Sequence, residues 1–175
     1  MVKGYHKNNV ADYKRACAFH QFAARGVRAY AYPILFLLAA VALLIIGIFA
    51  KNVALCIGAV ILFVLAVALP FITLAMQNAK IEKKVRNSRD YLKTEQFFTF
   101  EEDSLRLTVQ VGSRAESYDI PYAQIPRVYE RKDRYYIYIG VSQILILKKK
   151  NLREGSAAEL TELFRRLGKR FKEKR

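Results

Sequence analysis

The sequence offers few side chains that could act together as a catalytic centre. The two histidines, His6 and His20, both lie near the N-terminus. A histidine such as His20, in a helix-like stretch without an acidic partner, is more often packed or solvated than a general base. The run Glu101-Glu102-Asp103 separates two strand-like segments. Because neighbouring strand residues point to opposite faces, a turn explains this run better than a paired acid and base.

The motifs that mark common enzymes and metal sites are also missing from the sequence. We find no nucleophile elbow, zinc-protease helix or phosphate-binding loop. Cys17 and Cys56 are far apart, and Cys56 lies in an apolar segment, where it acts as a small hydrophobic residue. We therefore expect no catalytic residue, no metal, no cofactor and no enzymatic activity.

The most distinctive chemical property of the sequence is its excess of positive charge. The 175 residues include 30 Lys and Arg against 15 Asp and Glu, a formal net charge of +15. Such a balance suits anionic lipid, an acidic partner or nucleic acid, but no nucleic-acid-binding motif is present and we expect no such partner. The candidate contacts to anionic lipid are Lys83, Lys84, Arg86, Arg127, Arg131, Lys132, Arg134, Lys148, Lys149 and Lys150. The alternative is a solvated basic face with a lysine-protected strand edge.

Two long apolar segments divide the chain and separate its charged regions. Between residues 29 and 76 the chain carries one charge, Lys51. A helix needs about 20 apolar residues to cross a bilayer. We therefore predict two transmembrane helices within residues 30–76, over residues 30–50 and 53–76, with Lys51 at the tip of the hairpin. Apart from a cysteine, neither segment holds an ionisable residue, which argues against a pump or channel.

The orientation of the hairpin follows from its flanks. The segments before and after the hairpin each hold six Lys and Arg, whereas the tip holds one. Because positively charged flanks stay in the cytoplasm, we predict a multi-pass protein of the cell (inner) membrane with both termini cytoplasmic. The pattern of residues 1–29 predicts a short polar start followed by a cytosolic amphipathic helix. Residues 77–95 are predicted to form a basic juxtamembrane helix.

From residue 96 onward the hydrophobic period becomes that of strands. Residues 104–111 alternate between apolar and polar side chains, and a turn at Gly112-Ser113 follows. Residues 122–133, bounded and interrupted by prolines, predict a loop or short helical turn. Ser156 and Glu159 form a capping box, and apolar residues recur at helical spacing as far as Phe171.

The predicted fold class is therefore membrane α plus cytosolic α+β. A two-helix transmembrane hairpin is followed by a small antiparallel β domain over residues 96–175, with a C-terminal helix that caps it.

The order of these motifs resembles the YcxB-like family of small bacterial membrane proteins. The resemblance rests on ADY at residues 11–13, the two adjacent spans, FFTFEEDSL, IPYAQI, VYERKDRYYIYI, ILILKKKNL and the terminal helix. The β domain is similar to pleckstrin-homology-like folds. The resemblance implies a cytosolic domain of that kind and no catalytic residues, since the family defines none.

These observations lead to two functional hypotheses. The first is a non-enzymatic scaffold or regulator that presents its β domain at the inner leaflet and binds an anionic lipid head group or a protein partner. The alternative is a membrane partner subunit or immunity-type protein that occludes another membrane protein. Small residues such as Ala54 and Gly58 would serve its helix packing, or a homo-oligomer.

Overall fold

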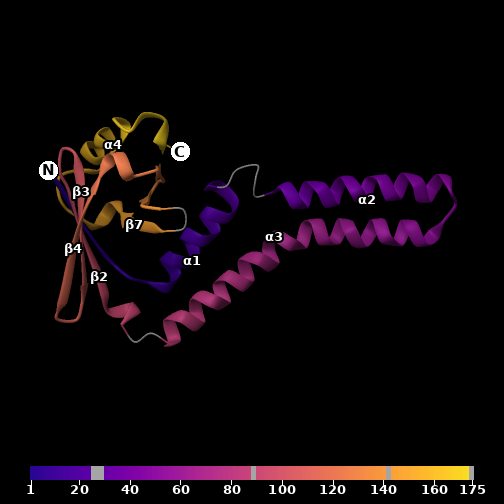
Figure 1. The fold of residues 1–175 in the computed structure, drawn as a ribbon, viewed down its shortest axis with the longest axis horizontal. Coiled ribbons are helices and arrows are strands. Elements are labelled where there is room, and N and C mark those ends of the chain that lie inside the picture. Colours follow the sequence, from indigo (N-terminus) through magenta and orange to yellow (C-terminus); the bar gives the residue numbers. More distant parts are fainter. Residues whose placement is uncertain (25–29, 88–89, 141–142, 174–175) are drawn as a thin grey trace. The chain divides into compact units, whose positions relative to one another are not determined.

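The computed structural model describes residues 1–24, 30–87, 90–140 and 143–173, with the backbone alone for Lys84, Arg86 and Tyr91. The chain divides into two compact units, one formed by Cys17–Lys84 and the other by Met1–Ala16 together with Val85–Arg175. The helices are α1 (Val10–Phe19), α2 (Ala31–Phe49), α3 (Val53–Asn87) and α4 (Ala157–Arg165) (Figure 1). The strands are β1 (Val2–Lys7), β2 (Thr94–Phe100), β3 (Ser104–Val111), β4 (Arg114–Pro121), β5 (Arg127–Glu130), β6 (Arg134–Tyr138), β7 (Ile144–Lys148), β8 (Leu152–Glu154) and β9 (Phe171–Glu173).

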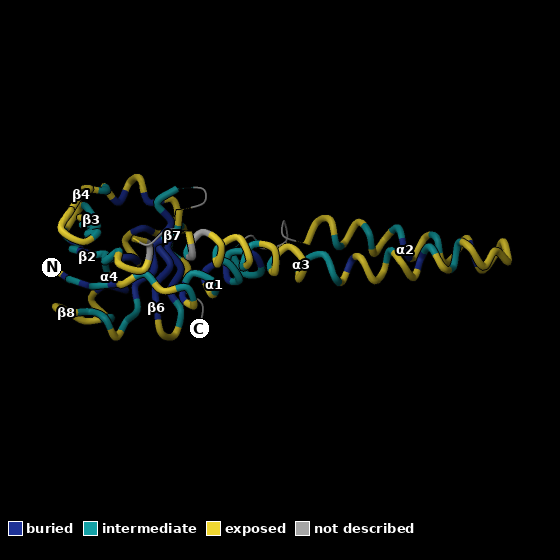
Figure 2. The backbone as a smooth tube through the Cα atoms, turned by 90° about the horizontal axis from the view of Figure 1, so that it is seen from below, coloured by how far each residue is buried: buried dark blue, intermediate teal, exposed yellow. Residues whose placement is uncertain are grey.

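Helices α2 and α3 form the hairpin that the sequence predicts. By length and composition, both can cross a membrane. At the tip, Lys51 adopts a left-handed backbone conformation (φ 50°), and the Asn52 side chain accepts a hydrogen bond of 3.0 Å from the Ala54 N–H. Large apolar residues along both helices are exposed, and Figure 2 colours much of the backbone of α2 and α3 as exposed. A surface of this kind is suited to lipid rather than to water.

Small residues let the two helices of the hairpin approach closely. Ala40, Gly47, Ala59 and Ala66 are buried. A Cβ atom on Gly47 would lie 2.8 Å from the Cys56 Sγ, so glycine is required at this crossing. The hydrophobic effect contributes little to the association of helices in lipid. Close van der Waals packing at these small residues stabilises the helix pair instead.

The β domain contains two sheets that share one core. The five-stranded sheet has the order β4-β3-β2-β1-β8, and the four-stranded sheet has the order β7-β6-β5-β9. All neighbouring strands are antiparallel except β5 and β9, which are parallel. Phe98, Phe100, Tyr135 and Phe164 are almost fully buried, and Phe164 of α4 packs edge-on against Phe100 and Tyr135. Helix α4 thus closes the core, as the sequence predicts.

The β domain includes N-terminal residues that lie outside its predicted range of 96–175. Residues 2–7, expected as a polar start to a separate helical segment, form β1 and lie between β2 and β8. Val2, Gly4 and His6 face inward, and Gly4 leaves room for Leu147, whose Cδ1 would lie 2.7 Å from a Cβ atom. The β domain therefore extends beyond residues 96–175. The predicted helix itself is present as α1, followed by a π turn over His20–Ala24. Residues 25–29 lie outside the described part.

Three further boundaries differ from the sequence prediction. Helix α3 continues the second span, but it ends at Asn87, and β2 begins at Thr94 within the predicted juxtamembrane helix. The predicted loop over residues 122–133 contains a 3-10 turn and then strand β5. The terminal helix ends at Arg165 because Gly168 turns the backbone to φ 60°, which places Phe171 in β9.

Candidate functional site

A basic pocket lies in the β domain, with a cavity volume of about 410 Å³. Helix α1, the β5–β6 turn and the end of β7 contribute to it. Its lining residues are Arg15, Asp133, Arg134, Lys148, Lys149 and Lys150. Five of these six side chains are cationic, so the pocket is suited to an anion.

The buried carboxylate of Asp12 fixes one wall of this pocket. Asp12 Oδ1 lies 3.1 Å from the Arg134 Nη1, and Asp12 Oδ2 lies 2.6 Å from the Lys148 Nζ. Burial works to raise the pKa of Asp12, but hydrogen bonds and charge from Lys148 and Arg134 outweigh it and hold the pKa below its usual value. Asp12 is therefore ionised at neutral pH and links α1 to the four-stranded sheet.

Arg134 is held from its other side by Asp133. The Arg134 Nη2 lies 2.5 Å from the Asp133 Oδ2, and the Arg134 Nε donates a 3.0 Å hydrogen bond to the Asp133 Oδ1. Arg134 is 4% exposed, whereas the Asp133 side chain is 62% exposed. The guanidinium is thus fixed in position by carboxylates on both sides, one buried and one at the surface.

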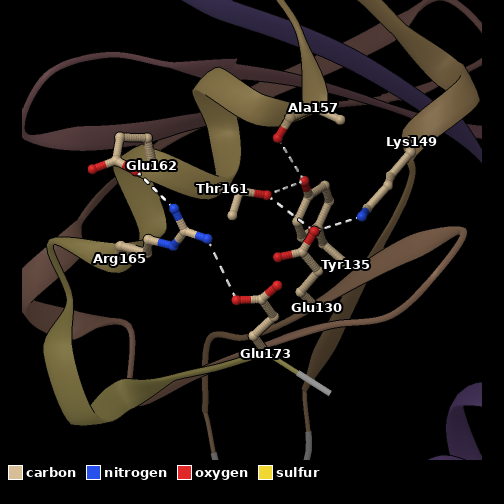
Figure 3. A network of polar contacts seen from close by, with 8 residues as sticks. All are labelled: Glu130, Tyr135, Lys149, Ala157, Thr161, Glu162, Arg165 and Glu173. Atoms are coloured by element: carbon tan, nitrogen blue, oxygen red, sulfur yellow. Dashed lines mark hydrogen bonds and ion pairs between the residues drawn. The ribbon is translucent and has the colours of Figure 1, made fainter. Parts of the chain in front are cut away.

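A second polar network holds Lys149 (Figure 3). Its Nζ lies 2.5 Å from the Glu130 Oε1, which also accepts a 3.0 Å hydrogen bond from the Thr161 hydroxyl. The Tyr135 hydroxyl lies 2.8 Å from the Thr161 Oγ1 and donates to the Ala157 carbonyl oxygen. Burial is the main cause that raises the pKa of Tyr135 to about 12, so the phenol stays protonated. This network ties the pocket to α4.

Two of the five cations remain available to a ligand. Arg15 and Lys150 are exposed, and no described carboxylate forms an ion pair with either. Arg15 does contribute, after Arg134, to lowering the pKa of Asp133. The pocket therefore has three cations that pair with carboxylates and two exposed cations at its surface.

The structure brings together four of the ten predicted lipid contacts. Arg134, Lys148, Lys149 and Lys150 line the pocket. The other three in the β domain, Arg127, Arg131 and Lys132, do not line it, and Arg127 instead donates a 3.1 Å hydrogen bond to the Tyr129 hydroxyl. Lys83 belongs to the hairpin unit. The side chains of Lys84 and Arg86 lie outside the described residues.

The sequence did not identify Arg15, Asp12 or Glu130 as parts of the site. Asp12 and Arg134 are 122 positions apart in the chain. No spacing rule connects residues at that distance. The one available signal was the ADY segment at residues 11–13, which belongs to the family resemblance and contains Asp12.

The acidic run lies in the turn between β2 and β3, as predicted. The Glu101 N–H donates a 3.0 Å hydrogen bond to the Ser104 carbonyl oxygen, and the Glu101 carboxylate lies 3.2 Å from the Arg106 Nη1. Glu101 and Glu102 also line a second cavity of about 620 Å³, together with Glu159 and Glu162 of α4. The charged residues that line this cavity are mainly acidic, although Arg166 is among them, whereas those of the first cavity are mainly basic.

Comparison with known proteins relates part of the chain to a protein family. No curated protein and no solved structure matches the chain. The model of a family described as YcxB-like protein matches residues 100–164. That range includes β3 to β8 and most of α4, and hence all of the pocket except Arg15. Residues 100–164 therefore match the YcxB-like family, as the resemblance of the sequence motifs predicted.

Proposed function

We propose that this is a two-span membrane protein that holds its YcxB-like domain at the cytoplasmic face and binds an anionic lipid head group through the basic pocket. The observation that carries the proposal is the pair of exposed cations, Arg15 and Lys150, beside cations that carboxylates already hold in place. Because carboxylates already hold Arg134, Lys148 and Lys149 in place, the pocket needs little rearrangement when it binds an anion.

Two features support the membrane arrangement. Two helices are apolar and long enough to cross a bilayer, and six Lys and Arg flank the hairpin on each side against one at its tip. The β domain is also built from both ends of the chain, with β1 between β2 and β8. Two crossings return the chain to the side where it began, which is the condition for these strands to pair.

The chemistry of the pocket supports binding rather than catalysis. The titratable side chains that line it are lysines and arginines with one carboxylate, and no cysteine, serine or histidine is among its described lining residues. Nucleophilic or acid–base catalysis needs a nucleophile beside a base, or two groups with separated pKa values. A pleckstrin-homology-like fold for the domain stays a prediction from the resemblance of the motifs.

Native mass spectrometry of the full chain tests the proposal. Protein released from a mixed bilayer of phosphatidylglycerol and phosphatidylcholine is expected to retain the anionic lipid preferentially. The double variant Arg15→Gln/Lys150→Gln is expected to lose most of this preference, because it removes the two available cations. The full chain is necessary because a fragment of residues 96–175 lacks β1.

A matched variant separates the pocket from the basic flank of the hairpin. Lys80→Gln/Lys83→Gln removes the same charge from exposed positions on α3. If this flank variant abolishes the lipid preference and the pocket variant leaves it intact, the pocket is not the binding site. Retention of a protein partner instead of lipid would favour the protein-binding hypothesis.

A further inference from the structure

The charges around the basic pocket do not balance. Its lining includes five cations, and three carboxylates pair with them: Asp12, Asp133 and Glu130. These eight described residues together therefore carry a net charge of +2. Arg131 and Lys132 in the neighbouring turn do not line the cavity. A ligand that neutralises the pocket carries two negative charges.

The arrangement of the donors also restricts the ligand. Arg134, Lys148 and Lys149 are each within 3.1 Å of a carboxylate oxygen, so their positions are set by the protein. Arg15 and Lys150 are exposed and reach the cavity from different segments, α1 and the turn after β7. An arginine binds two oxygens of a phosphate at once, and a lysine adds a point charge. One small group with several charged oxygens can therefore bind Arg15 and Lys150 at the same time.

We propose that the pocket selects a phosphomonoester dianion over a singly charged phosphodiester. This inference rests on the proposed function, in which the pocket binds an anionic head group. A phosphomonoester carries close to two charges at neutral pH and presents three terminal oxygens. A diester carries one charge and two such oxygens, which leaves one of the two available cations without a partner. The 410 Å³ cavity holds a group of this size.

Two soluble probes test this selectivity directly. The full chain, in nanodiscs of neutral phosphatidylcholine, is titrated by calorimetry with glycerol 3-phosphate, a monoester, and with glycerophosphoglycerol, a diester. We expect the monoester to bind at least tenfold more tightly at pH 7.5. Arg15→Gln/Lys150→Gln is expected to reduce this ratio to near one. The matched control Arg114→Gln/Lys172→Gln removes the same charge from exposed positions outside the pocket and is expected to preserve the ratio.

The outcomes separate this inference from the proposed function. Equal affinity for the two probes overturns monoester selectivity and leaves anion binding in place. If neither probe binds and the pocket variant retains lipid normally, both proposals fail. The source of the phosphate is tested with nanodiscs that contain phosphatidic acid. Weaker binding of glycerol 3-phosphate to these nanodiscs assigns the ligand to the lipid, and unchanged binding assigns it to a soluble phosphomonoester. Either result supports the ligand class.

Discussion

At the scale of single residues, Asp12 connects the most parts of the β domain. It is 3% exposed and pairs with Arg134 of β6 and Lys148 of β7, although it lies on α1. A buried ion pair adds little net stability, because desolvation offsets the attraction. The loss of one partner is costly, however, because a buried charge is then left without compensation.

Asp12→Asn is therefore expected to destabilise the β domain by about 3 kcal/mol, since Arg134 and Lys148 lose their shared anion. Urea unfolding of the full chain in detergent, followed by tyrosine fluorescence, measures the effect. Asp119→Asn is the control, because Asp119 pairs with Arg106 at the surface and such pairs contribute little. Similar stabilities for Asp12→Asn and the wild type would remove Asp12 from its linking role.

His6 gives the β domain a dependence on pH. Burial is the main cause that lowers the pKa of His6 from 6.5, and Lys148 and Arg134 act in the same direction against Asp12. The folded state thus binds a proton less readily than the unfolded state, so the stability from neutral His6 is full above pH 6.5 and falls as the pH drops below it. We expect the melting temperature to fall from pH 7.5 to 5.5, and to fall less in His6→Gln. Equal shifts in both proteins would contradict this.

At the scale of elements, the most predictable parts were those with a strong repeating pattern. The apolar helices α2 and α3 and the alternating strand β3 follow directly from their sequences. Whether residues 2–8 add a strand to the β domain could not be decided from the sequence, because the inward residues Val2, Gly4 and His6 of β1 do not form an apolar stripe. The terminal helix was predicted too long, because Phe171 keeps helical spacing although Gly168 ends the helix before it.

The turn before α4 depends on a glycine. Gly155 has φ 76°, and a Cβ atom there would lie 2.8 Å from the Val2 Cγ2 and 3.0 Å from the Glu159 Oε2. We expect Gly155→Ala to lower the free energy of unfolding by about 2 kcal/mol. Gly112→Ala provides the comparison, since Gly112 has φ 63° with open space around it. That variant carries the backbone strain without the clash, so an equal or larger loss for Gly112→Ala would be inconsistent with the packing at Gly155.

At the scale of the whole molecule, the sequence predicted the two parts of the fold but not how one of them is assembled. The fold class follows from the periodicity of each segment taken separately. The assembly of the β domain depends on β1 pairing with strands about 90 and 150 residues later, which no local pattern encodes. The same contact brings α1, and with it Arg15, to the basic pocket. For this reason Lys148, Lys149 and Lys150 were predictable as a cluster, whereas Arg15 was not.

The central claim is that both ends of the chain form one domain on the cytoplasmic side of the membrane. It is tested most directly by labelling single cysteines in intact cells with a membrane-impermeant thiol reagent. The native thiols are first removed with Cys17→Ser and Cys56→Ala. Single cysteines are then introduced in three separate variants, Lys51→Cys at the hairpin tip, Lys7→Cys in β1 and Ala158→Cys in α4, all at exposed positions.

The account predicts that the cysteine at position 51 reacts in intact cells, and that those at positions 7 and 158 react after the cells are lysed and not before. Labelling of positions 7 and 158 in intact cells, with position 51 protected, would place the domain outside. Labelling of only one of positions 7 and 158 would contradict a domain built from both ends.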